Sequence, residues 1–317
     1  MTIRFEPLTE EHLDRAVPLA HEAYHRACAH VPALIDPGAP VVLRRAVSQL
    51  ARTGSGAVAL EDDRLVGYLA FSDPIERLWN SGTGVHSPLH GNAFAGRQRS
   101  RLASRLFQHA AEPLVARGVE IFAITTYQHD HEVAAALSLN GFGMRCADAI
   151  RMVDHALEAE PVPGIAFREV RWEDAGPLLP LLNGLVRHLR QGPSFVGVTE
   201  FTQDDFAELR ARRKSRYFVA AARDEPIGYL EVTDDGENVL TTAPDMRNIC
   251  GAYLDERFRG KGIYDGLLAF TLATLREEGV ARIGVDFETM NPTALHFWTR
   301  YFDRYTTSYA RRIDALR

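Results

Sequence analysis

The fold that we predict for this chain rests on residues 248–275, which read NICGAYLDERFRGKGIYDGLLAFTLATL. A β-rich segment ends near Leu254, a loop reading Arg259-Gly260-Lys261-Gly262 follows, and an apolar helical pattern starts at once. Glycines let backbone N–H groups approach an anion closely, and the start of a helix adds positive potential. The stretch therefore predicts a strand, an anion-binding turn and a helix, with a pyrophosphate as the natural ligand. A plain strand-to-helix turn is the alternative that a short glycine motif leaves open.

The chain repeats itself at domain length. Residues 64–71 (RLVGYLAF) resemble residues 225–232 (EPIGYLEV), and their shared glycines are separated by 228 − 67 = 161 positions. Gly118 and Gly279 are separated by the same interval, 279 − 118 = 161. Each copy has the size of a domain. We therefore predict two tandem domains, residues 1–158 and 165–317, joined by a linker over 159–164, where two prolines and a glycine interrupt all periodicity.

The same coarse pattern of elements recurs in each half. A short strand comes first, two strands around a charged turn follow, and then come a central strand, a long helix, another strand and a final helix. In the first half we expect a helix from Glu10, with Thr9 as its N-cap, that Pro18 kinks or ends. The pattern predicts an α/β (α+β) fold in which each half is a mixed, mostly antiparallel twisted sheet flanked by helices.

Composition and charge restrict the partners of this protein. The net charge of −6 gives no electrostatic reason to expect a nucleic acid partner. No apolar run approaches the roughly 20 residues needed to cross a bilayer, and the first residues lack the features of a signal peptide. Three scattered cysteines and an isolated His129-Asp-His131 form neither a disulfide framework nor a metal-binding pattern. We expect a cytoplasmic protein without a metal site, monomeric or homodimeric.

A second motif lies nearer the C-terminus than the glycine-rich loop. After the expected strand Arg282–Glu288 comes Asn291-Pro-Thr-Ala294, with Phe297 and Phe302 further along the next helix. This motif and the loop resemble the GNAT family of N-acetyltransferases, whose cofactor loop reads Gln/Arg-x-x-Gly-x-Gly/Ala. Two registers fit that loop here. Arg259-x-x-Gly262-x-Tyr264 departs at the third fixed position, and Arg257-x-x-Gly260-x-Gly262 fits fully but lies two residues early relative to the strand end.

The resemblance implies that acetyl-coenzyme A is the cofactor and that the C-terminal half binds it. The residues that it assigns to the cofactor site are Ala252, Leu254, Arg259, Gly260, Lys261, Gly262, Ile263, Tyr264, Asn291 and Phe297. It also implies direct attack of an amine on the acetyl thioester, with backbone N–H groups at the end of the Cys250–Leu254 strand polarising the carbonyl.

The acceptor amine must lose a proton, so we expect a carboxylate near the thioester. Glu231, on the strand beside the cofactor strand, is the first candidate, and Asp286 and Glu288 on the following strand come next. For each of them, a solvated or salt-bridged carboxylate is the alternative interpretation.

The family often places a tyrosine on the last helix to protonate the thiolate. Trp298 stands at that position here, and an indole cannot serve as the acid. Tyr301, about one helical turn further along, is the substitute candidate. A packing aromatic at the end of the helix is the alternative for Tyr301.

The first half resembles a weakened copy of the second. Its counterpart loop, Arg97-x-x-Ser100-x-Leu102, lacks both fixed glycines, and Ser138 stands where the family has its tyrosine. We expect this half to be catalytically silent and to form a wall of the substrate cleft. The resemblance therefore implies an N-acetyltransferase acting on a primary amine of a small molecule. A catalytically idle acyl-coenzyme A sensor or scaffold, and a protein N-acetyltransferase, are the alternatives.

Overall fold

A computed structural model describes residues 3–35, 40–234, 236, 238–239 and 241–313 of the chain. The elements of the N-terminal half are β1 (Ile3–Pro7), α1 (Leu13–His30), α2 (Val41–Arg52), β2 (Gly56–Glu61), β3 (Arg64–Ala70), β4 (Ile75–Leu78), β5 (Gly82–Ser87), β6 (Asn92–Phe94), α3 (Arg99–Ala116), β7 (Ile121–Tyr127), α4 (His131–Leu139) and β8 (Gly143–Met152). The elements of the C-terminal half are β9 (Ile165–Val170), α5 (Leu179–Arg190), α6 (Gln203–Arg213), β10 (Arg216–Ala222), β11 (Glu225–Thr233), β12 (Met246–Leu254), α7 (Ile263–Glu277), β13 (Arg282–Glu288), α8 (Pro292–Tyr301), β14 (Asp303–Arg304) and β15 (Thr306–Arg312).

One long sheet runs through both halves in the order β4-β5-β7-β15-β8-β13-β12-β11-β10-β9, with β14 paired to β8 beside this path. A smaller sheet, in the order β1-β2-β3-β6, completes the N-terminal half. The pairs β5–β7 and β12–β13 are parallel, and the other pairs are antiparallel. The predicted fold class, a mixed and mostly antiparallel sheet flanked by helices, is confirmed.

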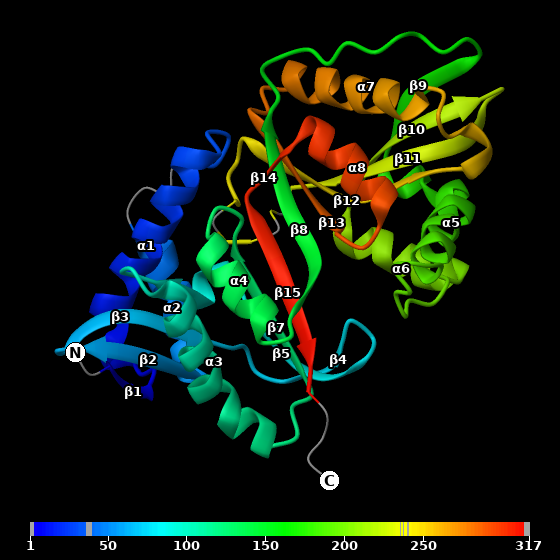
Figure 1. Cartoon of the computed structure of the whole chain (residues 1–317). Helices are drawn as coiled ribbons and strands as arrows, with labels where there is room; N and C mark the ends of the chain where they lie inside the picture. The colour runs from blue at the N-terminus through cyan, green and yellow to red at the C-terminus, as the bar shows by residue number, and fades with distance from the viewer. Residues whose placement is uncertain (1–2, 36–39, 235, 237, 240, 314–317) are drawn as a thin grey trace.

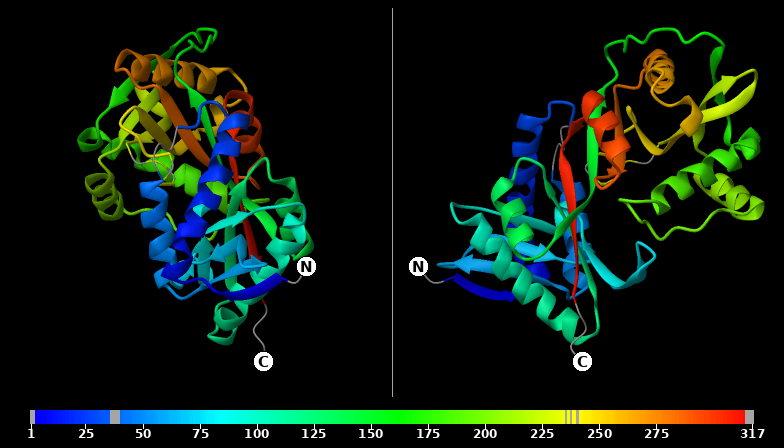
Figure 2. Two further views of the ribbon diagram at one scale, coloured as in Figure 1. Left: turned by 90° about the vertical axis from the view of Figure 1, so that its left-hand side faces the viewer. Right: turned by 45° about the vertical axis from the view of Figure 1, so that its right-hand side comes forward.

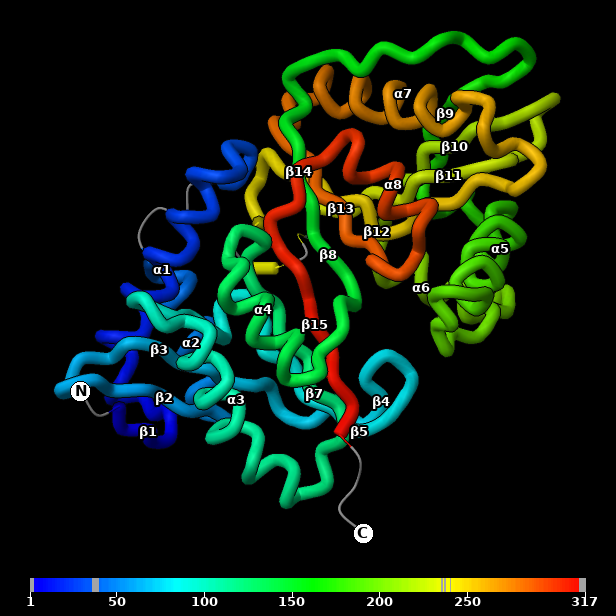
Figure 3. The backbone as a smooth tube through the Cα atoms, in the orientation of Figure 1, coloured from blue at the N-terminus to red at the C-terminus, as the bar shows by residue number. Residues whose placement is uncertain are grey.

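The last strand of each half pairs with the other half. β15 pairs with β7 from Thr306↔Tyr127 to Arg312↔Ile121. β8 pairs with β13 from Met152↔Arg282 to Cys146↔Glu288. The two exchanged strands also pair with each other, and they lie side by side along the centre of the molecule (Figure 3). The halves are therefore joined by hydrogen-bonded ladders as well as by the chain between them.

Successive side chains of a strand point to opposite faces of the sheet, so each strand contributes to a hydrophobic core on either face. On β8, Ala147 and Ala149 pack with α7 and α8, whereas Ile150 packs with α1. The helices α3, α4, α7 and α8 thus cover one face, and α1, α2, α5 and α6 contribute to cores on the other. α1 and the pair α5 and α6 lie at opposite ends of the molecule, with β8 and β15 between them (Figures 1 and 2).

Of the two effects predicted for Pro18, a kink or an end of the first helix, the structure excludes the end. α1 continues through Pro18 to His30, so Pro18 does not end the helix. The residues around it, among them Val17 and Leu19, are buried in the core, and their burial offsets the hydrogen bond that proline removes. Thr9 stands before a 3-10 turn that leads into α1, and its backbone N–H donates to His12 Nδ1. Within the described residues, we find no helix that combines the length and apolar character required of a membrane span.

Candidate functional site

The site begins where β12 separates from β13. The parallel ladder between these strands ends at Ile249↔Val285, whereas the antiparallel ladder between β12 and β11 continues to Gly228↔Leu254. The register between β11 and β12 shifts here, because Glu231 pairs with Gly251 and Val232 pairs with Ile249. Cys250 is therefore the extra residue of a bulge, which bends the strand. Among the described residues, no strand pairs with the edge of residues 250–254 that faces β13, so its backbone groups are available to a ligand.

The glycine-rich loop lies at the end of this open edge. Gly260 and Gly262 have φ values of +74° and +73°, in the left-handed region that favours glycine. A Cβ atom at either glycine would meet nothing within 4 Å, so open space lies above the loop. The first hydrogen bond of α7 joins the N–H of Gly266 to the carbonyl of Gly262, which leaves the N–H groups of residues 263–265 without helical acceptors. This arrangement suits an anion at the start of α7.

A cavity of about 470 Å³ joins the open edge, the loop and α8. We call it the C-terminal slot. Nine of the ten predicted cofactor residues line it: Ala252, Leu254, Arg259, Gly260, Gly262, Ile263, Tyr264, Asn291 and Phe297. Lys261, the tenth, is not among the lining residues, and its ammonium donates to the carbonyl of Arg257. Residues from both predicted motifs therefore lie around one cavity.

Tyr264, which departs from the family loop pattern, anchors the start of α7. Its hydroxyl donates to the carbonyl of Tyr229 on β11 over 3.0 Å, and its ring packs edge-on against Phe297 with centroids 5.1 Å apart. The side chain thus connects the helix, the sheet and α8. The departure leaves the backbone of the loop in the glycine conformation described above.

Asn291 caps α8 and also contacts α5. Its side-chain oxygen accepts from the N–H of Ala294 at 3.4 Å and from the Thr293 hydroxyl at 2.7 Å. His188 Nε2 on α5 lies 3.3 Å from the same oxygen. His188 lines the slot as well, and sequence reasoning missed it because no short motif connects α5 with α8. The capping position of Asn291, by contrast, is local and readable from the sequence.

The proposed acid lies beside the slot rather than in its lining. The Tyr301 hydroxyl contacts Asp265 in the first turn of α7, and Arg300 contacts both groups. Burial and the bond to Asp265 raise the pKa of Tyr301. Trp298 is 3% exposed and packs in the core under α8.

Glu231 is buried, at 2% exposure, on the face of the sheet that carries α5 and α6. Its carboxylate accepts from the Ser215 hydroxyl at 2.7 Å and from Arg213 at 3.4 Å. A Cβ atom at Gly251 would lie 2.9 Å from Glu231 Oε2. The carboxylate therefore lies over Gly251, next in the chain to the slot-lining Ala252.

Three further carboxylates lie on the next two strands of this face, β13 and β8. Glu288 forms an ion pair with Arg145 at 3.2 Å, and burial raises its pKa. Asp286 pairs in register with Asp148 of β8. Burial and the neighbouring Asp286 carboxylate raise the pKa of Asp148 to about 7. Sequence reasoning missed Asp148, because the pairing of β8 with β13 joins residues from different halves.

The corresponding place in the N-terminal half is closed. Leu69 and Leu230 are equivalent positions of the repeat. Asn92 pairs with Leu69 and Ala252 pairs with Leu230, so Asn92 occupies the position that corresponds to Ala252. The Asn92 amide donates to the carbonyl of Thr125 at 2.9 Å and to the Ser87 hydroxyl at 3.2 Å. Only about 10 Å³ of cavity remains beside it. Four residues, 95–98, join β6 to α3, whereas eight residues, 255–262, join β12 to α7.

Comparisons with known proteins agree with this geometry. Residues 184–303 match the model of the acetyltransferase (GNAT) family. A search of curated proteins gives no match. Among solved structures, a GCN5-related N-acetyltransferase from Sphaerobacter thermophilus is 12% identical, with a TM-score of 0.61 over 98% of this chain and 95% of that one.

Two other solved structures are similar over nearly the whole of this chain. The GCN5-related glucosamine N-acetyltransferase region of a fungal multi-domain GH3 beta-N-acetylglucosaminidase is 15% identical, with a TM-score of 0.57 over 98% of this chain and 38% of that one. A tandem GNAT protein from the clavulanic acid biosynthesis pathway is 15% identical, with a TM-score of 0.49 over 98% of both chains. At 12% and 15% identity, the similarities to the Sphaerobacter thermophilus protein and to the fungal region show the fold alone.

Proposed function

We propose, from the match of residues 184–303 to the model of the acetyltransferase (GNAT) family, that the C-terminal half transfers an acetyl group from acetyl-coenzyme A to a primary amine of a small molecule. The observation that carries the proposal is the C-terminal slot. It joins free N–H groups at the start of α7 to an unpaired strand edge of β12. The family supports acyl-coenzyme A-dependent acetyl transfer in general, and the acceptor is our own inference.

The residues of the slot fit coenzyme A. The approachable N–H groups of residues 260–264 would hold the diphosphate, with Arg259 at the rim of the slot. Asn291 and the open edge of β12 would face the pantetheine arm. When bound, the cofactor supplies an acetyl group activated as a thioester. Backbone N–H groups of residues 250–254 would then stabilise negative charge on the carbonyl oxygen.

We assign removal of the amine proton to the carboxylates behind the slot. Glu231 is the first candidate, because it lies over Gly251 beside the slot and is fixed by Ser215 and Arg213. Glu288 is the second, and its raised pKa favours uptake of a proton. Asp148, with a pKa of about 7, is a third that the N-terminal half contributes.

These carboxylates also argue for a cationic acceptor. They lie on the face of the central sheet away from α7 and α8, on strands of both halves. An ammonium group would be attracted to such a surface before it loses its proton. A small amine that binds between the halves fits this placement, whereas a protein terminus would require an open groove.

The proposed proton donor to the thiolate is Tyr301. Its raised pKa keeps the hydroxyl protonated at neutral pH, as an acid requires. Tyr301→Phe should lower kcat by about 100-fold if the hydroxyl donates this proton. A near-normal kcat would instead assign Tyr301 to packing and leave protonation to solvent.

The decisive experiment compares two substitutions at Gly262. Asp and Asn both tolerate the left-handed conformation, so they differ mainly in charge. Calorimetric titration should show that Gly262→Asp weakens binding of acetyl-coenzyme A by at least about 10-fold relative to Gly262→Asn, because the carboxylate repels the diphosphate. Equal binding by both variants would show that the loop does not hold the diphosphate.

A catalytically idle sensor is the second candidate function. Trp298 stands in place of the family tyrosine, and the Tyr301 hydroxyl is already bonded to Asp265. Release of free coenzyme A in the presence of a panel of small amines separates the two functions. Binding of acetyl-coenzyme A without release would favour the sensor.

A further inference from the structure

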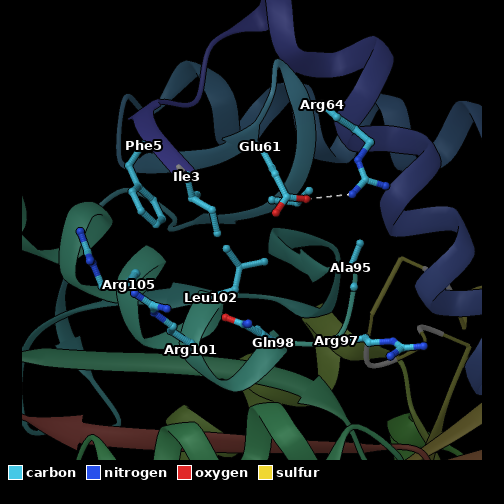
Figure 4. Close-up of a pocket in the computed structure, with 12 residues that line it drawn as sticks. Ile3, Phe5, Glu61, Arg64, Ala95, Arg97, Gln98, Arg101, Leu102 and Arg105 are labelled. Carbon is cyan, nitrogen blue, oxygen red and sulfur yellow. Dashed lines mark hydrogen bonds and ion pairs between the residues drawn. The ribbon is translucent and has the colours of Figure 1, made fainter. Parts of the chain in front are cut away.

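The N-terminal half has a cavity of its own, away from the closed slot. It measures about 680 Å³ and lies between α3 and the strands β1, β2 and β3 (Figure 4). We call it the arginine groove. It is lined by Ile3, Phe5, Glu61, Arg64, Val66, Ala95, Gly96, Arg97, Gln98, Arg101, Leu102 and Arg105. The floor is apolar, and charged side chains lie around it.

The charges around the groove are mostly positive. Arg97, Arg101 and Arg105 have no carboxylate ion-pair partner in the described part of the chain. Glu61 is the acid in the lining, and it is bonded to Arg64 at 3.0 Å. Arg101 and Arg105 are one helical turn apart, where like charges repel each other. An anion in the groove would relieve this repulsion.

The start of α3 adds to the positive potential. The first helical bond joins the N–H of Leu102 to the carbonyl of Gln98, and the Gln98 side chain gives no cap. The N–H groups of residues 99–101 therefore lack helical acceptors. The first turn has no acidic residue and carries two arginines, against the usual preference for acids at this end. α7, in contrast, has Asp265 in its first turn.

The corresponding place in the C-terminal half is filled. Phe167, the counterpart of Phe5, contacts α7 so closely that a Cβ atom at Gly266 would lie 2.7 Å from its ring. The stack of Phe167 on Phe270, with centroids 6.2 Å apart, is common to both halves, because Phe5 stacks on His109 at 4.5 Å. Phe258, in the eight-residue connection, packs on the same core. The groove is thus a feature of the N-terminal copy, where the connection from β6 to α3 has four residues.

We propose that the arginine groove binds a phosphorylated small molecule. Guanidinium groups on two sides and free N–H groups at the start of α3 suit phosphate oxygens. The apolar floor, with Phe5 and Leu102, suits an organic body attached to the phosphate. This site is separate from the C-terminal slot and does not depend on acetyl transfer.

The test uses ADP and inorganic pyrophosphate as probes on the full-length protein. The Gly262→Asp substitution removes the C-terminal slot as a competing site. Calorimetric titration should detect binding of ADP by this variant. Arg101→Gln combined with Arg105→Gln should weaken it by at least about 10-fold, because two charge-assisted contacts are lost.

The matched control is Arg212→Gln combined with Arg276→Gln. These exposed helical arginines lie elsewhere, and the change in net charge is the same. The control should bind ADP as the parent does. Pyrophosphate that binds as tightly as ADP would support the site and assign it to phosphate alone. Failure of both probes to bind, or equal losses in the control and the groove variant, would overturn the proposal.

Discussion

The two halves place different residues at the same point of the same architecture. Ala252 lines an open slot of about 470 Å³ in the C-terminal half, and Asn92 fills the matching place in the N-terminal half, where about 10 Å³ remains. The Asn92 amide donates to Ser87 at the end of β5 and to Thr125 on β7. These hydrogen bonds join the two strands where the slot would otherwise open. In this chain, the slot is open or closed according to one side chain and the length of one loop.

The largest effect is expected when the closing side chain is introduced into the open slot. Ala252→Asn should reduce the affinity for acetyl-coenzyme A by about 100-fold, because the amide would occupy space that the ligand requires. Calorimetric titration measures the change. Ala252→Ser is the control, since its short side chain does not reach across the slot. Unchanged binding by the Asn variant would refute the role given to Ala252.

The glycines that precede Ala252 and Asn92, Gly251 and Gly91, allow a second test of the difference between the halves. A Cβ atom at Gly251 would lie 2.9 Å from Glu231 Oε2, and one at Gly91 would lie 2.7 Å from the Ser87 hydroxyl oxygen. Gly251→Ala and Gly91→Ala should each lower the free energy of unfolding by about 2 kcal/mol through overpacking. Denaturant titration checks this effect. Only Gly251→Ala should also lower kcat, because it displaces the carboxylate proposed as the base.

The pH dependence of stability tests the pairing of Asp148 on β8 with Asp286 on β13. In the folded protein the pKa of Asp148 is raised from 3.8 to about 7, so folding favours its protonated form. The stability that this group contributes is fully present below about pH 4 and is lost as the pH rises through about 7.

Asp148→Asn should therefore stabilise the protein at about pH 8 relative to about pH 5, by roughly 1–3 kcal/mol. Denaturant titrations at the two pH values give the difference. Asp62→Asn, in an exposed turn, serves as the control. A variant whose stability follows the same pH profile as the parent would contradict the carboxylate pair.

The smallest effect is expected from opening the closed slot. Asn92→Ala should lower the free energy of unfolding by about 1–2 kcal/mol, because the carbonyl of Thr125 loses a buried partner. It should not create a site for acetyl-coenzyme A, since the four-residue connection before α3 lacks the glycine-rich loop. Thermal denaturation with and without the cofactor checks both statements. A shift caused by the cofactor only in this variant would show that one side chain alone closes the slot.

Short-range features of the sequence account for much of the geometry of the candidate site. Gly262 adopts a left-handed conformation, and Asn291 caps a helix three residues ahead, so both depend on neighbours in the chain. The hydrophobic pattern also predicted α7 and β13. Such features arise from short-range physics, which a single sequence records.

Contacts between distant parts of the chain could not be predicted in this way. The pair Asp148 and Asp286 depends on the register of β8 against β13, and His188 reaches Asn291 from a helix more than 100 residues away in the chain. Sheet register between distant strands depends on tertiary packing rather than on local preference. Pro18 shows the same limit, because burial around α1 outweighs a local signal to end the helix.

The exchanged strands also restrict how this protein can move. The central sheet is continuous through the pair β15–β8, so a rotation of one side of the sheet against the other would have to break the backbone hydrogen bonds between these two strands. Hinge closure around a substrate, common in enzymes built from two lobes, is therefore costly here. We therefore expect entry and exit of ligands to depend on smaller movements at the rim, such as displacement of α5, which would break the contact between His188 and Asn291.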